Sequence, residues 1–327
     1  ARPGAAGPGG PGPWGRPPWL REAEAPPEAA ASRSVGRGDS KRLKLGEEEE
    51  EGEGEGEAGG LGRAMAESHL RAGDRVLIVG RDRTRLERTL EDLSSCAKAG
   101  GGLIRGAVCD VGDAAQVEKL GRTALDDLGE IDGFICNAAS NGYLYENLVD
   151  TPVEKLQEVV QTNALGVLLC SREAMRIMQA QGDRGGDLFL LTGAGSDGTA
   201  TSLYSSYGFT KAGLPQLAAS LRKETEGSAI GVHTLSPGLV FTDLLVGGED
   251  KFGQMGNFAV NLIGEDADTV AAEVVPQVRE VLEVGNGPRK GRDLKYLTPD
   301  KIIAKLSGRL LRKEGKARFY NEDEIWF

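Results

Sequence analysis

Histidine and cysteine, on which metal sites, disulfide frameworks and many catalytic triads depend, are scarce in this sequence. Its 327 residues include two histidines, His69 and His233, and four cysteines that lie far apart without a CxxC pair. This spacing excludes a disulfide framework and a structural zinc site, and two histidines disfavour a His-rich metal centre or a His-based triad. No apolar run reaches the roughly 18 residues that a membrane-spanning helix needs. We expect a protein of a reducing compartment that holds no metal.

The charge is unevenly distributed along the chain. Against 39 Lys and Arg stand 50 Asp and Glu, a net charge of -11, which excludes nucleic-acid binding by the chain as a whole. Residues 289–318 reverse this balance with eleven bases and three acids, and their apolar residues recur at helical spacing. We expect residues 289–327 to form a basic amphipathic C-terminal extension. It either packs on the domain as a solvated helix or contacts an anionic membrane or an acidic partner.

Residues 1–58 differ in composition from the rest of the chain. They contain eight of the fourteen prolines and a run of eight glutamates from Glu47 to Glu57 that only glycine interrupts. A segment with so little apolar surface cannot offset the entropy lost on ordering, so we expect it to be disordered. Residues 1–44 partly match a transit peptide in composition, whereas the glutamate run does not.

Residues 59–288 alternate apolar runs with amphipathic stretches. This order predicts an α/β fold, a Rossmann-like doubly wound parallel sheet with helices on both faces. The expected strands are Arg75–Val79, Leu103–Cys109, Ile131–Cys136, Asp187–Thr192 and Ala229–Leu235. The expected helices are Gly62–Arg71, Thr84–Ala97, Ala114–Leu128, Pro152–Gln181 and Tyr204–Glu226.

The glycines ahead of the first helix have the spacing of a phosphate-binding loop. Gly56, Gly60 and Gly62 satisfy G-x-x-x-G-x-G, and the amides at the helix start could hold a pyrophosphate. Such a loop should follow a nearly continuous apolar strand, but the residues before it are the glutamates, which cannot be buried unpaired. We therefore expect the first strand to be missing or replaced and the match of Gly56 to be accidental. Gly60, Leu61 and Gly62 are the expected loop.

Tyr207 and Lys211 are the strongest candidates for catalysis. Their Y-x-x-x-K spacing puts both on one face of a helix. A cation beside a phenol stabilises the phenolate, which suits the tyrosine to act as a general acid toward a carbonyl oxygen. Tyr204 is a nearby competitor, but four residues after it stands Gly208, so it lacks a lysine partner.

Further motifs close the expected strands in a fixed order around this pair. They are Cys109-Asp110-Val111, then Cys136-Asn137-Ala138-Ala139, and finally Ser236-Pro237-Gly238 followed by Thr242. In order and context, the stretch from Gly60 to Thr242 resembles the short-chain dehydrogenase/reductase family.

This resemblance implies a nicotinamide-dependent carbonyl reduction. Tyr207 would protonate the carbonyl oxygen, Lys211 would bind the nicotinamide ribose, and Asn163 would support a proton-relay water. The residues implied to contact the cofactor are Asp110 and Val111 at the adenine, Asn137 and Ala138 at the adjoining ribose, and Pro237, Gly238 and Thr242 at the nicotinamide. Members of the family often form dimers or tetramers, so the resemblance is compatible with a homo- or hetero-oligomer of this chain.

The replacement for the family's catalytic serine and the choice of cofactor depend on individual residues near the expected site. The family usually places a serine thirteen residues before the tyrosine, where this chain has Ala194. Ser196 is the expected substitute, ahead of Thr192, because a glycine-rich turn could bring it over the carbonyl. Bases lie where the cofactor's ribose is expected, Arg81 at a strand tip and Arg63 after Gly62. They favour the 2′-phosphate of NADPH, although both could instead be solvated surface bases.

Shorter strings resemble the chlorophyll b reductases within this family. They are Ser140–Tyr145, the GAGSDG turn, YGFTK and Leu235–Leu245, together with the basic tail. The resemblance implies NADPH-dependent reduction of the 7-formyl group of chlorophyll b to hydroxymethyl, in chlorophyll breakdown at the chloroplast thylakoid. A wide mouth for the tetrapyrrole could be lined by Tyr143, Tyr145, Phe241, Leu244 and Leu245. Two alternatives stay open, a reductase of another lipid, steroid or acyl carbonyl and a catalytically inactive Rossmann module with a binding or regulatory role.

Overall fold

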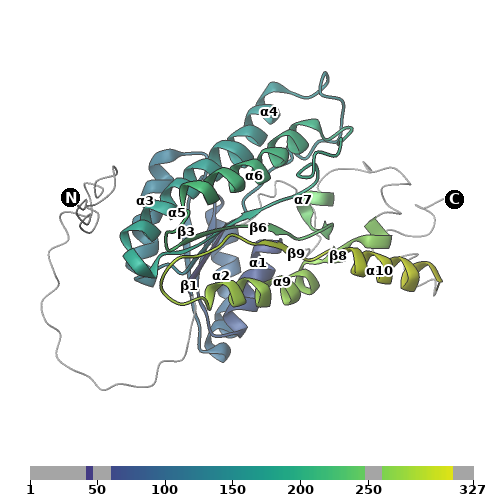
Figure 1. Cartoon of the computed structure of the whole chain (residues 1–327). Helices are drawn as coiled ribbons and strands as arrows, with labels where there is room; N and C mark the ends of the chain where they lie inside the picture. Colours follow the sequence, from purple (N-terminus) through teal and green to yellow (C-terminus); the bar gives the residue numbers. More distant parts are fainter. Residues whose placement is uncertain (1–41, 47–59, 247–259, 312–327) are drawn as a thin grey trace, which may run out of the picture. The chain divides into compact units, whose positions relative to one another are not determined.

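A seven-stranded parallel sheet organises the residues that the computed structural model describes, which are 42–46, 60–246 and 260–311 (Figure 1). Its strand order is β3-β2-β1-β4-β5-β6-β9, and each neighbouring pair is parallel. The order reverses between β1 and β4, which makes the sheet doubly wound and confirms the predicted fold class. The strands are β1 (Arg42–Gly46), β2 (Arg75–Gly80), β3 (Leu103–Val108), β4 (Gly133–Cys136), β5 (Gly186–Leu191), β6 (Ile230–Ser236) and β9 (Asp293–Lys295).

The expectation that the first strand would be missing is wrong, and the alternative that another sequence would replace the apolar strand stays a prediction. β1 lies in the centre of the sheet, hydrogen-bonded to β2 on one side and to β4 on the other. Its sequence, RLKLG, alternates bases with leucines and so differs from the apolar run that the sequence argument required. It also stands well ahead of α1 (Leu61–Arg71), because residues 47–59 intervene. Those residues include the glutamate run and Gly56 and lie outside the described part of the chain.

Two strands extend the sheet beyond the range 59–288 in which it was predicted. β1 precedes that range, and β9 follows it and pairs with β6 from Thr234↔Asp293 to Ser236↔Lys295. The rest of residues 1–58 and residues 312–327 lie outside the described residues, so the predicted disorder of the head stays a prediction. A separate short pair joins β7 (Val240–Phe241) to β8 (Glu265–Asp266).

Helices cover both faces of the sheet, and each face has its own hydrophobic core (Figure 1). One core packs α1, α2 (Arg83–Gly100) and α9 (Ala267–Leu282) against the sheet. The other packs α3 (Ala114–Leu128), α5 (Val167–Ala180) and α6 (Ser205–Glu224) against it. Successive residues of a strand point to opposite faces, so β2 supplies Val76 and Ile78 to the first core and Leu77 and Val79 to the second.

One predicted helix is divided by a π-helical segment. In place of a continuous helix over Pro152–Gln181, the chain forms α4 (Val153–Val160), a π-helix η2 (Gln161–Gly166) and then α5. Gly166 ends the π-helix against Val111, whose Cγ2 atom would lie 2.8 Å from a Cβ added to the glycine. Short π-helical segments inside longer helices occur frequently at functional sites. This one carries Asn163.

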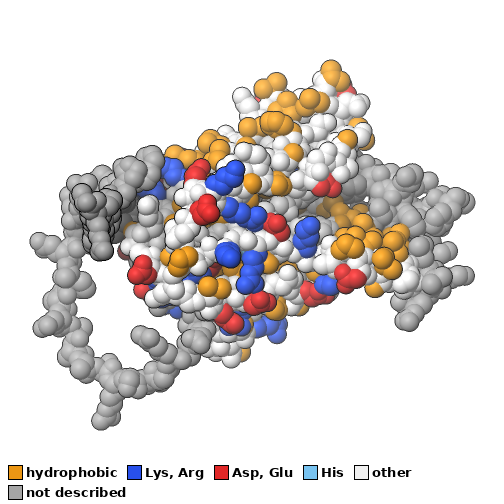
Figure 2. All heavy atoms as spheres, in the orientation of Figure 1, with side chains coloured by type: hydrophobic (Ala, Val, Ile, Leu, Met, Phe, Trp, Pro, Cys, Tyr) orange, Lys and Arg blue, Asp and Glu red, His pale blue; other side chains and the backbone are white. Residues whose placement is uncertain are grey.

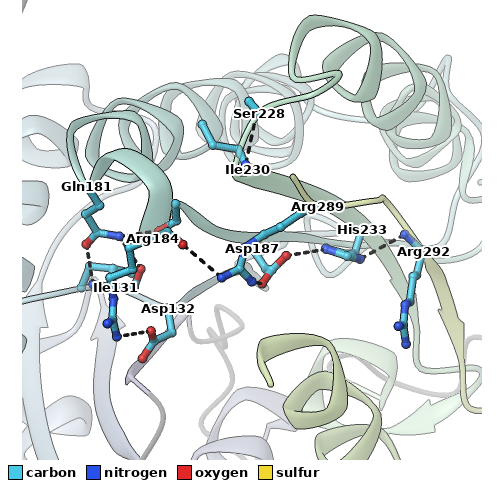
Figure 3. A network of polar contacts seen from close by, with 11 residues as sticks. Ile131, Asp132, Gln181, Arg184, Asp187, Ser228, Ile230, His233, Arg289 and Arg292 are labelled. Carbon is cyan, nitrogen blue, oxygen red and sulfur yellow. Dashed lines mark hydrogen bonds and ion pairs between the residues drawn. The ribbon is translucent and has the colours of Figure 1, made fainter. Parts of the chain in front are cut away.

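Buried charges fasten the segment after α9 to the sheet (Figure 3). Asp187, near the start of β5, accepts hydrogen bonds from the Arg289 guanidinium and from Nε2 of His233, the latter at 3.0 Å. Nδ1 of His233 accepts the backbone N–H of Arg292 at 3.0 Å, so the neutral ring carries its proton on Nε2. The side chains of Asp187 and Arg289 are 2% and 7% exposed. This network fixes the chain immediately before β9.

Several bases of the C-terminal segment pair with acids of the domain. The pairs are Arg289–Asp187, Arg292–Glu280, Lys301–Glu273 and Lys305–Glu265, the last two from α10 (Pro299–Leu311). The ammonium groups of Lys301 and Lys305 also lie 4.7 Å and 5.1 Å from the centroid of the Tyr296 ring. For these four bases the contacts favour packing of the segment on the domain over attachment to another surface.

Figure 2 shows basic and acidic side chains interspersed on one face of the molecule, with hydrophobic side chains gathered over α10. Ile303 on this helix is 67% exposed. None of the helices in the described part of the chain is both long enough and apolar enough to cross a membrane.

Arg289→Met should destabilise the fold strongly, because it removes the ion-pair partner of the buried Asp187 carboxylate and leaves it the hydrogen bond from the neutral His233 ring. Removal of one member of a buried ion pair costs about 3–5 kcal/mol. The matched control is Arg292→Met, which breaks an exposed pair with Glu280 and should cost less than about 1 kcal/mol. Urea unfolding of both variants measures the difference, and equal losses would contradict the structural role of Arg289.

Candidate active site

The predicted site residues converge on one edge of the sheet. Because every strand is parallel, the loops that follow the carboxyl ends of the strands meet at this edge. The residues placed there are Arg81 after β2, Asp110 and Val111 after β3, Asn137 and Ala138 after β4, Ser196 after β5, and Pro237, Gly238 and Thr242 after β6. Tyr207 and Lys211 reach the same edge from α6, and Asn163 reaches it from η2.

Tyr207 and Lys211 lie one turn apart on α6, and both are buried. The Lys211 Nζ atom lies 5.4 Å from the centroid of the Tyr207 ring. It also donates a hydrogen bond of 3.1 Å to the carbonyl oxygen of Leu191, the last residue of β5. The strand therefore holds the lysine in a position where its charge acts on the phenol. Such an arrangement is suited to proton transfer by a tyrosine.

Asn163 is tied to this pair through a second residue. Its Nδ2 group donates to the carbonyl oxygen of Ser140 at 2.7 Å and to Thr210 Oγ1 at 3.1 Å, and Thr210 in turn donates to the carbonyl oxygen of Tyr207 at 2.7 Å. The Asn163 Oδ1 atom accepts the backbone N–H of Ser140 at 2.7 Å. Both amide hydrogens of the Asn163 side chain are thus engaged with protein atoms. The side chain positions the loop after β4 relative to α6.

Gly193 lies directly against the phenol of Tyr207. A Cβ atom added to this glycine would stand 2.5 Å from the Tyr207 hydroxyl oxygen, so no larger residue fits without moving the phenol. The backbone N–H of Gly193 donates to Ser196 Oγ at 2.9 Å, whereas Thr192 Oγ1 donates to Leu235 O at 3.3 Å on β6. Ser196 therefore belongs to the same turn that abuts the phenol. Between the two hydroxyls considered, this geometry favours Ser196.

The N-terminus of α1 presents backbone N–H groups of its first turn, which are donors of the kind that bind anions. Gly60 is its N-cap and makes no side-chain capping hydrogen bond, and no acidic residue occupies the first turn. Leu61 is fully buried, which fixes the start of the helix in the core. Arg63 lies in this turn and forms an ion pair of 3.6 Å with Glu67. The first-turn amides and Arg63 together favour a phosphate group here.

Arg81 follows β2 directly, is exposed, and faces a carboxylate from another element. That carboxylate is Glu158 of α4, which accepts hydrogen bonds from the Ser140 hydroxyl at 2.6 Å and from Lys155 at 3.0 Å. Burial acts to raise the pKa of Glu158, but the Ser140 hydroxyl, the Lys155 ammonium and the charge of Arg81 together hold it below its ordinary value. Glu158 is therefore ionised at neutral pH and offsets part of the positive field at the strand tip.

A hollow between the strands and the π-helix brings together the residues that follow β3 and β4. It is lined by Val111, Asn137 and Ala138 and closed by Thr162 and Gly166 of η2. Asp110 stands beside it, with its carboxylate accepting the backbone N–H of Gly112 at 2.8 Å. The predicted adenine and ribose residues are therefore neighbours in space.

The segment after β6 closes the edge on the side of Tyr207. Gly238 has a φ of 79°, a left-handed conformation that favours glycine, and Thr242 is buried immediately before α7 (Asp243–Val246). Leu244 of α7 packs in a small cluster with Ala139 and Tyr207. Of the residues expected to line a substrate mouth, Leu244 lies against the phenol, Tyr143 is buried, and Tyr145, Phe241 and Leu245 are half-buried.

Sequence reasoning missed the residues that hold the site residues in place. Ser140, Thr210 and Glu158 form the hydrogen bonds described above. Ser140 and Thr210 lie in the strings Ser140–Tyr145 and YGFTK but were given no role, and Glu158 lies in none of the quoted strings. Gly193 could have been noticed, because it opens the glycine-rich turn GAGSDG. Within the described residues, no group of three or more His, Cys, Asp or Glu is arranged to hold a metal ion.

Comparison with known proteins identifies the family to which the chain belongs. The family model described as short chain dehydrogenase matches residues 55–251. The probable chlorophyll(ide) b reductase NYC1 of Oryza sativa subsp. japonica is 39% identical over 282 residues, which cover 80% of this chain and 54% of that protein. The chlorophyll(ide) b reductases NOL of the same species and of Arabidopsis thaliana are each 37% identical over 267 residues, covering 81% of this chain and 76% and 74% of theirs. The chain thus spans about half the length of the first relative.

Solved structures show the same fold at low identity. An alcohol dehydrogenase from Thermococcus sibiricus complexed with 5-hydroxy-NADP has a TM-score of 0.62 at 20% identity, covering 80% of this chain and 99% of that one. A 3-ketoacyl-(acyl-carrier-protein) reductase from Brucella melitensis complexed with NADH also has a TM-score of 0.62 at 20% identity, covering 78% and 96%.

Ser140→Ala should destabilise the protein by about 1–2 kcal/mol at neutral pH, because the Glu158 carboxylate loses a charged hydrogen bond. The folded-state pKa of Glu158 is lowered, so this bond stabilises the fold above the pKa of the unfolded chain and is lost as pH falls through the folded value. The difference from wild type should therefore shrink in acid. Urea unfolding across this pH range measures it, with Ser94→Ala as the control, because the Ser94 hydroxyl donates to Glu91 O in an exposed hydrogen bond without a charged partner. A loss that does not depend on pH would contradict the role of Glu158.

Proposed function

Because the chain belongs to the short-chain dehydrogenase/reductase family and is therefore an oxidoreductase, we propose that it reduces a carbonyl group with NADPH, and that this group is the 7-formyl of chlorophyll b. The proposal depends above all on the buried Tyr207 phenol, held between Gly193 and Lys211 at the carboxyl edge of the sheet. Relatives at 37–39% identity are named chlorophyll(ide) b reductases, which supports the choice of substrate.

The residues at the edge fit a dinucleotide. The first turn of α1 offers backbone amides to a pyrophosphate, with Gly60, Leu61 and Gly62 at the approach. Asp110, Val111, Asn137 and Ala138 would hold the adenosine half, and Pro237, Gly238 and Thr242 the nicotinamide half. Structural neighbours named as complexes with NADH and with an NADP derivative show that this fold accepts either dinucleotide. Arg63 and Arg81 support NADPH here, since both offer positive charge to a 2′-phosphate.

Each catalytic residue has a defined task in this reaction. When bound, NADPH supplies a hydride to the formyl carbon. Tyr207 donates its hydroxyl proton to the carbonyl oxygen, and Lys211, fixed by Leu191, stabilises the phenolate that remains. Ser196 holds the carbonyl oxygen near the phenol. Asn163 maintains the position of α6 and of the relay that returns a proton to Tyr207.

The relatives' names also bear on location. NYC1 and NOL are named as chloroplastic, which supports a chloroplast location for this chain. We place the enzyme at the thylakoid, where its tetrapyrrole substrate is found. The exposed apolar surface of α10 and the remaining bases of residues 289–318 are the contacts that we assign to the membrane.

Tyr207→Phe tests the reaction. The variant keeps the ring but removes the transferable proton, so kcat for chlorophyll b reduction should fall at least about 100-fold. Quantification of 7-hydroxymethyl chlorophyll by liquid chromatography gives the rate. Tyr296→Phe, which removes a buried hydroxyl that contacts Glu265 at 3.4 Å, is the control and should remain within about twofold. Equal rates in Tyr207→Phe and wild type would refute the role of the phenol, and turnover restricted to steroid or acyl carbonyls would refute the substrate.

Arg81→Ala tests the choice of cofactor. Loss of its charge should raise KM for NADPH about tenfold or more and leave KM for NADH nearly unchanged, because only NADPH carries the 2′-phosphate. Arg83→Ala is the matched control, since Arg83 is also exposed but pairs with Glu87 on α2 at 3.7 Å. Initial rates with each cofactor measure the ratio, and an equal change for both cofactors would contradict the assignment.

A further inference from the structure

Three tyrosine rings are stacked in series beside the proposed reaction centre. The Tyr145 and Tyr204 ring centroids lie 4.9 Å apart with an interplanar angle of 11°, and those of Tyr204 and Tyr207 lie 4.4 Å apart at 25°. Tyr145 belongs to the loop after β4, whereas the other two begin α6. The stack therefore joins the proposed general acid to a separate loop of the edge.

The outer members of this stack are themselves anchored. Tyr204 is hydrogen-bonded through its side chain to Asn141 and to Tyr145. Asn141 also donates to the carbonyl oxygen of Leu244, and Tyr145 donates to that of Leu245 at 3.1 Å. The Tyr204 ring thus lies between the phenol of Tyr207 and two residues that hold α7.

The backbone is left-handed at two residues next to the stacked tyrosines. In the described part of the chain, the non-glycine residues with a left-handed φ are Tyr143 at 55° and Leu203 at 61°. Leu203 immediately precedes Tyr204, and Tyr143 stands two residues before Tyr145. The carbonyl of Leu203 accepts the backbone N–H of Glu146 at 3.1 Å, which joins the two loops. Such conformations cost about 1–3 kcal/mol each and persist where the surroundings enforce them, typically at functional sites.

We propose that Tyr204 is a positioning residue, whose ring fixes the orientation of the Tyr207 phenol and links it to the segment that follows β6. The inference rests on the proposed function, because it assigns Tyr207 as the proton donor. A ring packed face to face at this distance restricts rotation of Tyr207 about χ1 and χ2. Burial and the neighbouring phenols of Tyr207 and Tyr145 hold the pKa of Tyr204 well above 10, so Tyr204 keeps its own proton and does not compete as the acid.

Two substitutions separate the ring from its hydroxyl. Tyr204→Leu removes the stack and should lower kcat at least about tenfold, since misplacement of a catalytic group by about an ångström is costly. Tyr204→Phe keeps the stack and should retain kcat within about threefold. The dissociation constant for NADPH, from nicotinamide fluorescence, should change by less than about twofold in both, because the Tyr204 ring stacks on Tyr145 and Tyr207 and not on the residues assigned to the adenosine half. Phe209→Leu, an aromatic residue of the same helix that is 72% exposed, is the control and should match wild type.

The outcomes distinguish this inference from the proposed function. If wild type reduces no carbonyl with NADPH, the function itself is wrong. If wild type is active and Tyr204→Leu retains its kcat, or Tyr204→Phe loses as much as Tyr204→Leu, the positioning role of the ring is wrong. Thermal unfolding of each variant shows whether it folds. Rescue of kcat by phenylalanine, with leucine inactive and both folded, is the result that a merely structural tyrosine would not give.

Discussion

The backbone hydrogen bonds of β1 join the two halves of the sheet. β2 and β3 lie on one side of this strand, and β4, β5, β6 and β9 lie on the other, so in the described structure the halves meet through β1. The proposed site depends on that junction, because Arg81 comes from one half and Tyr207 contacts the other. Main-chain N–H and C=O groups form the hydrogen bonds of both ladders. A strand in which bases alternate with leucines can therefore occupy the central position for which an apolar strand was expected.

Close backbone approach, more than any single side-chain pair, sets the geometry at the edge. Gly193 lets the chain after β5 touch the Tyr207 hydroxyl, and the main-chain N–H and C=O of Ser140 both bond to Asn163. Glycines and peptide groups at these contacts leave little freedom for rearrangement. The catalytic residues are therefore positioned by the loops that follow β4 and β5, and Thr210 transmits the constraint to α6.

Much of this architecture follows from local patterns in the sequence. The strands predicted between Arg75 and Leu235 and the helices predicted between Gly62 and Glu226 end within three residues of the observed ones, although η2 divides one of these helices. The elements β7, β8, α9 and β9 were not predicted. The site motifs were found because parallel strands bring their carboxyl ends together wherever the fold is doubly wound. β1 was missed because its apolar content is low and because α1, the helix that follows it, begins far along the sequence. The tyrosine stack was missed because it joins residues of two loops. Neither the pairing of β1 with its neighbouring strands nor the stacking of the tyrosines produces a periodic pattern of apolar residues in the sequence.

The placement of β1 also has a consequence for the order of folding. Its partner β2 follows closely in the sequence, but its partner β4 comes only after α1, α2, β3 and α3 have been traversed. Contacts that span so much chain form slowly, because the entropy of closing the intervening loop opposes them until the neighbouring structure exists. We therefore expect the ladder between β1 and β4 to form late, after two partial sheets with unpaired inner edges. Such edges associate with those of other molecules, which makes this interval the one in which a newly made chain is most exposed to aggregation.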